Sequence, residues 1–317
     1  MRAVFLDYAT FSSGLDITAI EKTTSELICY DFTSPEQIIT RCINADIIIT
    51  NKVILDEAIL KQLPQLKLIC VAATGINNID ISAATANRIS VTNVSNYAGP
   101  AVAQYIFSQL LSLLQDVEHH NQNVQQGLWS VSKSFCVHGN AINELYGRSI
   151  GILGYGHIGQ TVATIAQAFG MNVIIAEHPN AKLIREGRVC FENMLKQSDI
   201  VSLHCPLTPT TKHIINQKSI ASMRENSILI NTARGGLINS NDLLNALKSK
   251  QIGYAILDVL EQEPPTTDHP LLAKSLGNLR ITAHIAWASQ QAQQRLLNII
   301  AENITQFSLG TSINQVN

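Results

Sequence analysis

Three side chains that could bind and protonate a small anion follow apolar, strand-like segments in this 317-residue chain. They are Arg234, Glu263 and His284. An arginine can hold a carboxylate through two parallel hydrogen bonds. A histidine can donate or remove a proton near neutral pH, and a neighbouring carboxylate can orient its ring. An arginine, a carboxylate and a histidine that each follow a strand-like segment therefore predict acid–base chemistry on an anionic substrate.

Each of the three residues also has an ordinary explanation when it is considered alone. Arg234 could pair with a surface acid, and His284 could be a hydrogen-bonded histidine of the core. Glu263 precedes two prolines and could be a simple loop carboxylate. Their joint appearance at successive strand ends favours function, because ligands of open parallel sheets bind outside the carboxyl ends of the strands.

A glycine-rich stretch in the middle of the chain predicts a dinucleotide site. Its residues are Gly154, Tyr155, Gly156, His157, Ile158 and Gly159. The first glycine permits a tight turn, the second lets backbone N–H groups approach a pyrophosphate, and the third lets the next helix pack on the strand. A strand-like run at 149–153 precedes the stretch and a helical pattern at 161–169 follows it, as the motif requires. A glycine-rich turn without a ligand is the alternative.

Glu177 ends the next strand-like run, 172–176. A carboxylate at this place can hydrogen-bond the ribose diol of NAD, whereas it repels the 2′-phosphate of NADP. His178 and Lys182 are the nearby residues that argue the other way, and no arginine follows directly. We therefore predict NAD(H) as the cofactor.

Strand-like runs alternate with helical patterns over most of the chain, which is typical of parallel sheets covered on both faces. The runs are 3–6, 27–30, 46–50, 68–71 and 90–92, then 149–153, 172–176, 200–203, 227–231, 254–257 and 279–282. A final helical pattern, 289–307, is expected to pack back on the first domain. We predict an α/β fold of two doubly wound domains. A Rossmann NAD-binding domain, 99–287, is inserted into a flavodoxin-like substrate-binding domain, 1–98 and 288–317.

The composition narrows the possible partners. A formal net charge of −2 gives no sign of nucleic acid or a membrane surface, and no apolar run has the length of a bilayer span. The six cysteines form no CxxC pair and the nine histidines form no metal-binding cluster, so we expect reduced thiols, a cytoplasmic protein and no metal. An apolar helical pattern at 101–117 and a polar, irregular arm at 121–145, anchored by Trp129 and Phe135, predict a twofold homodimer.

The chain resembles the D-2-hydroxyacid dehydrogenase family over nearly its full length. Besides the glycine stretch, the resemblance rests on Leu203-His-Cys-Pro-Leu-Thr-Pro-Thr-Thr211, Asn231-Thr-Ala-Arg-Gly-Gly236, Leu257-Asp-Val-Leu-Glu-Gln-Glu-Pro264 and His284-Ile-Ala-Trp-Ala-Ser289. It implies that Arg234, Glu263 and His284 are catalytic and that NAD(H) reduces a 2-oxoacid. Ala283 departs from the family pattern, which has proline there, and so does the arm around 137–143.

The resemblance also implies roles for further residues. Thr74 and Gly75 match the loop whose backbone N–H groups bind the substrate carboxylate, although a plain turn is the simpler explanation there. Asn51 and Trp287 are assigned to substrate binding, and Asp258 matches the aspartate that holds the nicotinamide carboxamide. The other residues assigned to the cofactor are His204, Cys205, Pro206, Thr211, Thr232 and Ala233, together with Arg234 and His284 themselves.

The segment that ends in Trp287 resembles the glycerate dehydrogenase and hydroxypyruvate reductase branch, which implies hydroxypyruvate or glyoxylate as substrate. Two alternatives remain open at this point. The chain could be a phosphoglycerate or D-lactate type of dehydrogenase from the same family. It could also be a non-enzymatic, NAD-sensing module like the corepressors that resemble this family and keep the same three residues.

Overall fold

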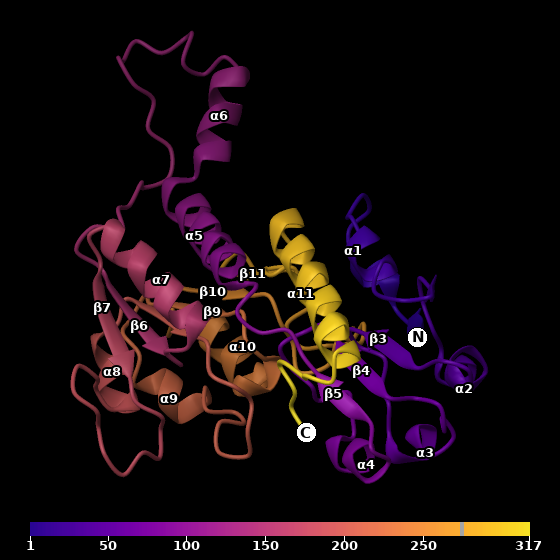
Figure 1. Ribbon diagram of the computed structural model, residues 1–317. Helices are drawn as coiled ribbons and strands as arrows, with labels where there is room; N and C mark the ends of the chain where they lie inside the picture. Colours follow the sequence, from indigo (N-terminus) through magenta and orange to yellow (C-terminus); the bar gives the residue numbers. More distant parts are fainter. Residues whose placement is uncertain (273–275) are drawn as a thin grey trace. The chain divides into compact units, whose positions relative to one another are not determined.

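The computed structural model describes residues 1–272 and 276–317, and it divides into two compact units (Figure 1). One unit consists of Met1–Ala98 and Trp287–Asn317, and the other of Gly99–Ala286. We had assigned Trp287 to the second domain, which was wrong by this one residue. Its ring packs edge-on against Phe11 and Tyr97, with centroids 5.7 and 6.2 Å away, and this packing ties it to the first unit.

The first unit contains a five-stranded parallel sheet in the order β2-β1-β3-β4-β5, which is the flavodoxin-like order. Its strands are β1 Arg2–Phe5, β2 Glu26–Cys29, β3 Ile47–Thr50, β4 Leu68–Val71 and β5 Ser90–Thr92. All residues of β3 and β4 are buried. Their continuous apolar sequence follows from this, because both faces of a parallel sheet are covered.

Short helices connect these strands, and one long helix returns from the end of the chain. They are η1 Tyr8–Thr10, α1 Thr18–Glu21, η2 Pro35–Gln37, α2 Ile38–Cys42, α3 Glu57–Leu60, α4 Ile81–Ala86 and α11 Gln290–Ser308. Asp56, Asp80 and Ser289 cap α3, α4 and α11, because each side chain accepts a hydrogen bond from a backbone N–H of the first turn. Helix α11 contacts α1 and β4, so the last helix completes the first unit.

The second unit contains a six-stranded parallel sheet in the order β11-β10-β9-β8-β6-β7. Its strands are β6 Ser149–Leu153, β7 Asn172–Ala176, β8 Ile200–Leu203, β9 Ile228–Asn231, β10 Tyr254–Leu257 and β11 Leu279–Ile281. Val189 forms a single parallel bridge with Ala176 of β7, at the place where the usual Rossmann order has a full strand. The sheet therefore has its switch of direction between β6 and β8, which is where such folds bind nucleotides.

Helices cover this sheet on both sides. They are α5 Gly99–Gln115, α7 His157–Ala168, α8 Phe191–Gln197, α9 Gln217–Ala221, η3 Gly235–Leu237 and α10 Ser240–Lys248, whereas α6 Val117–Gln125 extends from the end of α5 and has no buried residue. Helix α5 packs against α7, and a Cβ on Gly99 would lie 2.5 Å from the His157 ring, so a larger residue there would displace that ring. Within the described residues, no helix is long and apolar enough to span a bilayer.

The arm that we expected to be irregular from 121 to 145 begins as a helix. Helix α6 continues to Gln125 and has no buried residue, so its sequence lacks the apolar stripe that would have revealed it. Our prediction that two aromatic residues anchor the arm was also wrong in part. Trp129 is 52% exposed and donates to the Phe135 carbonyl over 3.0 Å, while the Phe135 side chain is 93% exposed.

Candidate active site

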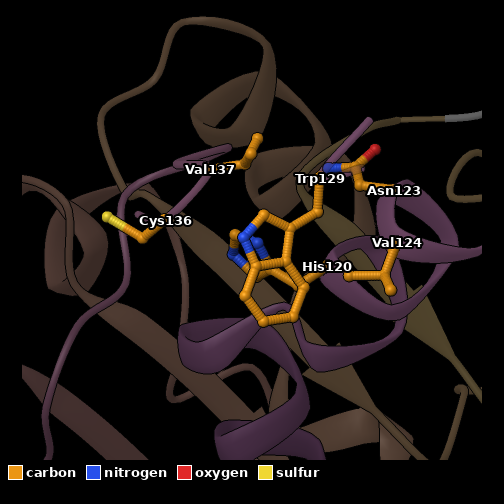
Figure 2. A pocket seen from close by; sticks show the side chains of 6 residues that line it. All are labelled: His120, Asn123, Val124, Trp129, Cys136 and Val137. Carbon is orange, nitrogen blue, oxygen red and sulfur yellow. The ribbon is translucent and has the colours of Figure 1, made fainter. Parts of the chain in front are cut away.

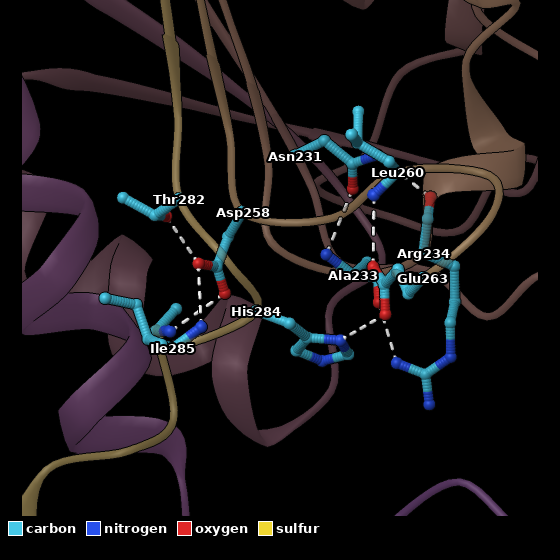
Figure 3. Close-up of polar contacts among 10 residues, drawn as sticks. Asn231, Ala233, Arg234, Asp258, Leu260, Glu263, Thr282, His284 and Ile285 are labelled. Carbon is cyan, nitrogen blue, oxygen red and sulfur yellow. Dashed lines mark hydrogen bonds and ion pairs between the residues drawn. The ribbon is translucent and has the colours of Figure 1, made fainter. Parts of the chain in front are cut away.

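The loop that carries Arg234 is shaped by the last residue of β9. The Asn231 side chain accepts a hydrogen bond from Ala233 N (3.0 Å) and donates one to Arg234 O (2.9 Å) (Figure 3). The Arg234 guanidinium donates to Ala233 O over 2.7 Å. Asn231 is fully buried, so it fixes the turn from inside the sheet. Sequence analysis did not single out Asn231, although an asparagine at a strand end is a common turn-forming residue.

A close backbone contact brings the loop after β9 against the loop after β10. A Cβ on Gly235 would lie 1.9 Å from Leu260 C and 2.3 Å from Glu261 N, so only glycine permits this approach. Arg234 precedes that contact in one loop, and Glu263 follows it in the other. The residues of the two strand ends are therefore held next to each other by backbone rather than by flexible side chains.

Glu263 and His284 form a direct pair. One Glu263 carboxylate oxygen accepts from Leu260 N over 3.0 Å, and the other lies 2.7 Å from His284 Nδ1 (Figure 3). Glu261 has a different partner, because its carboxylate contacts His213 Nε2 and accepts from the Ser240 hydroxyl at 3.3 Å. The structure therefore pairs Glu263 with His284, and Glu261 helps to hold the loop from the other side.

Asp258 organises the segment on which His284 lies. Its side chain is 1% exposed and accepts hydrogen bonds from Thr282 Oγ1 (2.5 Å), Ile285 N (2.9 Å) and Ala286 N (2.8 Å) (Figure 3). Since a carboxylate has about four acceptor positions, about one is left for any other donor. The sequence assigned Asp258 to the nicotinamide carboxamide; the structure gives it a second role that we had not anticipated.

The backbone of His284 needs this support. Its φ angle is +55°, in the left-handed region that costs a residue with a side chain about 1–2 kcal/mol. His284 N donates to Asp258 O over 2.8 Å, so the main chain of Asp258 also fixes the segment. The Tyr105 hydroxyl lies 2.6 Å from Thr282 Oγ1, which extends the network to helix α5.

The glycine stretch has the geometry of a pyrophosphate cradle. Gly154 has φ +97°, and a Cβ on Gly159 would lie 2.2 Å from Gly154 O, so both positions require glycine. A Cβ on Gly156 would meet no atom within 4 Å, which leaves the space in front of this backbone open. Helix α7 begins at His157, four residues earlier than expected, and its N-terminus points its partial positive charge at that space.

The other residues assigned to the cofactor lie at the carboxyl ends of β7, β8 and β9. A Cβ on Gly154 would lie 2.5 Å from the backbone of both His204 and Cys205, so the loops after β6 and β8 adjoin. Thr211 donates to Pro206 O over 2.8 Å and thereby shapes the loop after β8. Thr232 Oγ1 is buried and has no hydrogen-bond partner among the described residues, which fits a polar ligand at this rim.

Two groups near this rim have strongly shifted pKa values. Burial lowers the pKa of His204 to about 4, so the ring is neutral at pH 7, and its Nε2 lies 2.9 Å from the Ser202 hydroxyl. Burial raises the pKa of the Cys205 thiol to about 11. Because the thiolate is the nucleophilic form, Cys205 is a poor nucleophile at neutral pH.

The residues assigned to substrate lie in the first unit, apart from Arg234. Asn51 N donates to the Asp7 carboxylate at 2.9 and 3.0 Å, and Asn51 Nδ2 donates to Thr10 Oγ1 at 3.1 Å. Thr10 is the last residue of η1, and Phe11, which follows it, packs against the Trp287 ring. Asn51 and Trp287 therefore contact neighbouring residues at the end of η1. In the Thr74-Gly75 loop, the Thr74 side chain donates to the Val94 carbonyl over 2.8 Å.

The glycine stretch at the switch point, with Arg234, Glu263 and His284 after β9, β10 and β11, fits an NAD-dependent dehydrogenase. Residues 107–286 match the model of the D-isomer specific 2-hydroxyacid dehydrogenase NAD-binding domain. The chain belongs to the D-2-hydroxyacid dehydrogenase family, and it is an oxidoreductase that uses NAD(H).

Relatives are similar along the whole chain. A glycerate dehydrogenase of Methylorubrum extorquens is 40% identical over 99% of this chain and 98% of its own. A hydroxypyruvate reductase of Blautia hydrogenotrophica is 38% identical, with all of both chains covered. The NAD complex of a D-isomer specific 2-hydroxyacid dehydrogenase from Lactobacillus delbrueckii ssp. bulgaricus superposes with a TM-score of 0.76 at 25% identity over 100% of both chains.

Proposed function

We propose that this protein reduces hydroxypyruvate or glyoxylate to the D-2-hydroxyacid, with Arg234, Glu263 and His284 as its catalytic residues. The single observation that supports this most is the 2.7 Å contact between Glu263 and His284 Nδ1. With Nδ1 at Glu263, we assign to Nε2 the exchange of a proton with the substrate, and to Glu263 the stabilisation of the imidazolium.

The proposed roles follow from the chemistry of a 2-oxoacid. Arg234 binds the substrate carboxylate with its planar fork and polarises the carbonyl. The backbone N–H groups of Thr74 and Gly75 take a further share of the carboxylate charge. The bound NADH supplies the hydride. His284 supplies the proton to the carbonyl oxygen, and in the reverse direction it takes the proton from the hydroxyl.

The choice of a small, polar oxoacid rests on relatives and on one side chain. The Methylorubrum and Blautia proteins are named for glycerate and hydroxypyruvate, which interconvert by this reaction. The one side chain is Trp287, whose ring packs against Phe11 and Tyr97 and which belongs to the segment that resembles the glycerate dehydrogenase and hydroxypyruvate reductase branch. The test is the initial rate of NADH oxidation with hydroxypyruvate, glyoxylate, pyruvate and 3-phosphohydroxypyruvate. A kcat/KM for pyruvate above that for the first two would favour a D-lactate type of enzyme.

The same rates distinguish the proposed reductase from a phosphoglycerate dehydrogenase and from a non-enzymatic sensor. A preference for the phosphorylated acid would favour a phosphoglycerate type of dehydrogenase. Tight NADH binding without turnover of any acid would favour a non-enzymatic, NAD-sensing module. The similarity along the whole chain to proteins named hydroxypyruvate reductase and glycerate dehydrogenase supports an enzyme.

We also propose a twofold homodimer in which the arm takes part. Helix α6 and the loop after it extend from the end of α5 (Figure 1). The arm exposes Val131 (79%), Phe135 (93%) and Ile142 (55%), and it lines an open pocket of about 200 Å³ beside Trp129 and Cys136 (Figure 2). So much exposed apolar surface supports a contact with a second copy. Light scattering at micromolar concentration tests this, and a monomeric mass would contradict it.

A cytoplasmic location is part of the proposal as well. All six cysteines are free thiols, and Cys42, Cys70 and Cys205 are buried. Free thiols are typical of a reducing compartment. Fractionation of the cells that make the protein, followed by immunoblotting, tests this location.

A further inference from the structure

The Thr74-Gly75 loop is held from one side by the residues that follow β5. Val94 N donates to Ala73 O over 3.1 Å. The Asn93 side chain donates through Nδ2 to Thr74 O over 2.8 Å, and the Thr74 hydroxyl donates to Val94 O over 2.8 Å. Two successive carbonyls of the loop, those of Ala73 and Thr74, therefore accept hydrogen bonds from the same short segment.

These two bonds decide where the N–H groups of the loop point. Both peptide units are trans, and in a planar trans unit the C=O and N–H bonds point in opposite directions. The Ala73 carbonyl shares its peptide unit with the N–H of Thr74, and the Thr74 carbonyl shares its unit with the N–H of Gly75. Both N–H groups therefore point away from the segment after β5, and within the described residues neither has a hydrogen-bond acceptor.

Asn93 is itself fixed by a buried residue of α11. Asn303 lies 210 positions away in the chain and is 1% exposed, and its Nδ2 donates to Asn93 O over 3.1 Å. Asn303 Oδ1 accepts from Asn314 Nδ2 over 2.8 Å, and Asn93 N donates to Asn314 O over 3.2 Å. This arrangement gives the buried amide a partner for its oxygen and for its nitrogen. The main chain of Asn93 is therefore held on both sides, which keeps its side chain directed at the loop.

We propose that Asn93 is a positioning residue for the substrate carboxylate, and that Asn303 acts through it. The proposal rests on the proposed function, in which the N–H groups of Thr74 and Gly75 bind that carboxylate. The hydrogen bond from Asn93 fixes the peptide unit that carries the N–H of Gly75. It also polarises this unit, because hydrogen bonds that follow one another in a chain strengthen each other. Without Asn93 the unit is freer to rotate, so that part of the binding energy goes into ordering it.

The test compares Asn93→Ala with the wild-type protein in steady-state kinetics with hydroxypyruvate and glyoxylate. Asn93 is half-buried, and the variant keeps the backbone bonds of this residue, so it should fold. KM should rise about 3- to 10-fold while kcat stays close to wild type, because binding of the ground state and of the transition state is weakened equally. The factor should be the same for both acids, since they share the carboxylate. The dissociation constant of NADH should not change.

Asn87→Ala is the matched control. Asn87 Nδ2 donates to Ala83 O over 2.8 Å at the end of α4, so this variant also removes one amide-to-carbonyl bond from the first unit. It should leave every kinetic constant at its wild-type value. An unchanged KM in Asn93→Ala, a rise that differs between the two acids, or an equal rise in Asn87→Ala would overturn the proposal.

Asn303→Ala, alone and combined with Asn93→Ala, tests the second step. If Asn303 acts through Asn93, the increase in KM that its loss causes should shrink when Asn93 is already absent, whereas independent effects multiply. Multiplied effects would overturn the role of Asn303. Asn303→Asp keeps the acceptor for Asn314 and loses the donor to Asn93, so it replaces the alanine variant if that variant does not fold.

Oxamate separates this proposal from the proposed function. It presents a carboxylate but is not reduced, so calorimetry can measure its binding to the protein–NADH complex without turnover. Asn93→Ala should bind it about 3- to 10-fold more weakly than wild type. Binding that depends on Asn93 in a protein without turnover would support the positioning role and contradict the reductase, and turnover without that dependence would do the reverse. A wild-type protein that neither reduces these acids nor binds oxamate would contradict both.

Discussion

Asp258→Asn separates two roles of this residue, one as a ligand of the cofactor and one as the organiser of the His284 segment. The wild-type carboxylate accepts from the Thr282 hydroxyl and from the N–H groups of Ile285 and Ala286. In the variant, an NH₂ group must face at least one of these donors. One buried donor then loses its partner, at about 1–3 kcal/mol, and the bonds that remain lose the strength of a charged acceptor. Together these effects amount to about 3–5 kcal/mol.

Domains of this kind are stable by about 5–15 kcal/mol, so the variant should fold and show its defect locally. Hydrogen exchange at the amides of Ile285 and Ala286 should accelerate by at least about a hundredfold, and kcat should fall by a similar factor as His284 leaves its left-handed conformation. Thr282→Val is the matched control, because it removes one hydroxyl, keeps both amide bonds and should cost about 1 kcal/mol. Native exchange rates combined with lost NADH binding would refute the organising role and favour direct contact with the cofactor.

The other predictions concern charge and protonation at the same rim. Arg234→Lys keeps the positive charge but cannot form two parallel hydrogen bonds to a carboxylate, so activity with 2-oxoacids should fall by orders of magnitude. NADH binding, measured by fluorescence, should survive. Turnover at the wild-type rate would contradict the role assigned to Arg234. Glu263→Gln removes the charge beside His284, so the decline of kcat/KM for reduction with rising pH should begin at a lower pH, and superimposable profiles would exclude Glu263 as the partner. The pKa of His204 is about 4 when folded and about 6.5 when unfolded, so the folded state resists protonation. Stability measured by urea unfolding should hold above pH 6.5 and fall by up to about 3 kcal/mol towards pH 4, and His204→Gln should flatten this slope.

The strands could be predicted from the sequence because buried parallel strands are continuous apolar runs. Strands β4, β5, β6, β7, β8 and β10 have the bounds that the sequence analysis expected. Helix α6 was missed, since a helix with no buried residue has no apolar stripe to reveal it. The bridge of Val189 to Ala176 was missed for a different reason, because one residue makes no pattern.

The contacts that build the site depend on which strands become neighbours. Thr282 and Ile285 lie 24 and 27 positions from Asp258 in the chain, and they meet it only because β10 and β11 pair. Arg185 was overlooked as a partner of Glu177 because it follows that residue by eight positions and donates to its carboxylate only when the segment 177–189 closes onto β7. Sequence motifs could name the reactive groups, but side-chain pairs at such separations follow from tertiary structure.

The arrangement of β9, β10 and β11 shows why unreactive residues matter as much as the reactive ones. The three strands are neighbours and parallel, and neighbouring strands lie about 4.8 Å apart, so the ends of β9 and β11 are separated by about 10 Å. Arg234 follows the first and His284 the last, which is too far for one small substrate unless the loops converge. Gly235 draws the β9 loop onto the β10 loop, and Asp258 turns the β11 segment back towards β10. Glu263, which lies in the middle loop, can then contact the histidine, so the proposed chemistry depends on a glycine and a buried carboxylate that take no part in proton transfer.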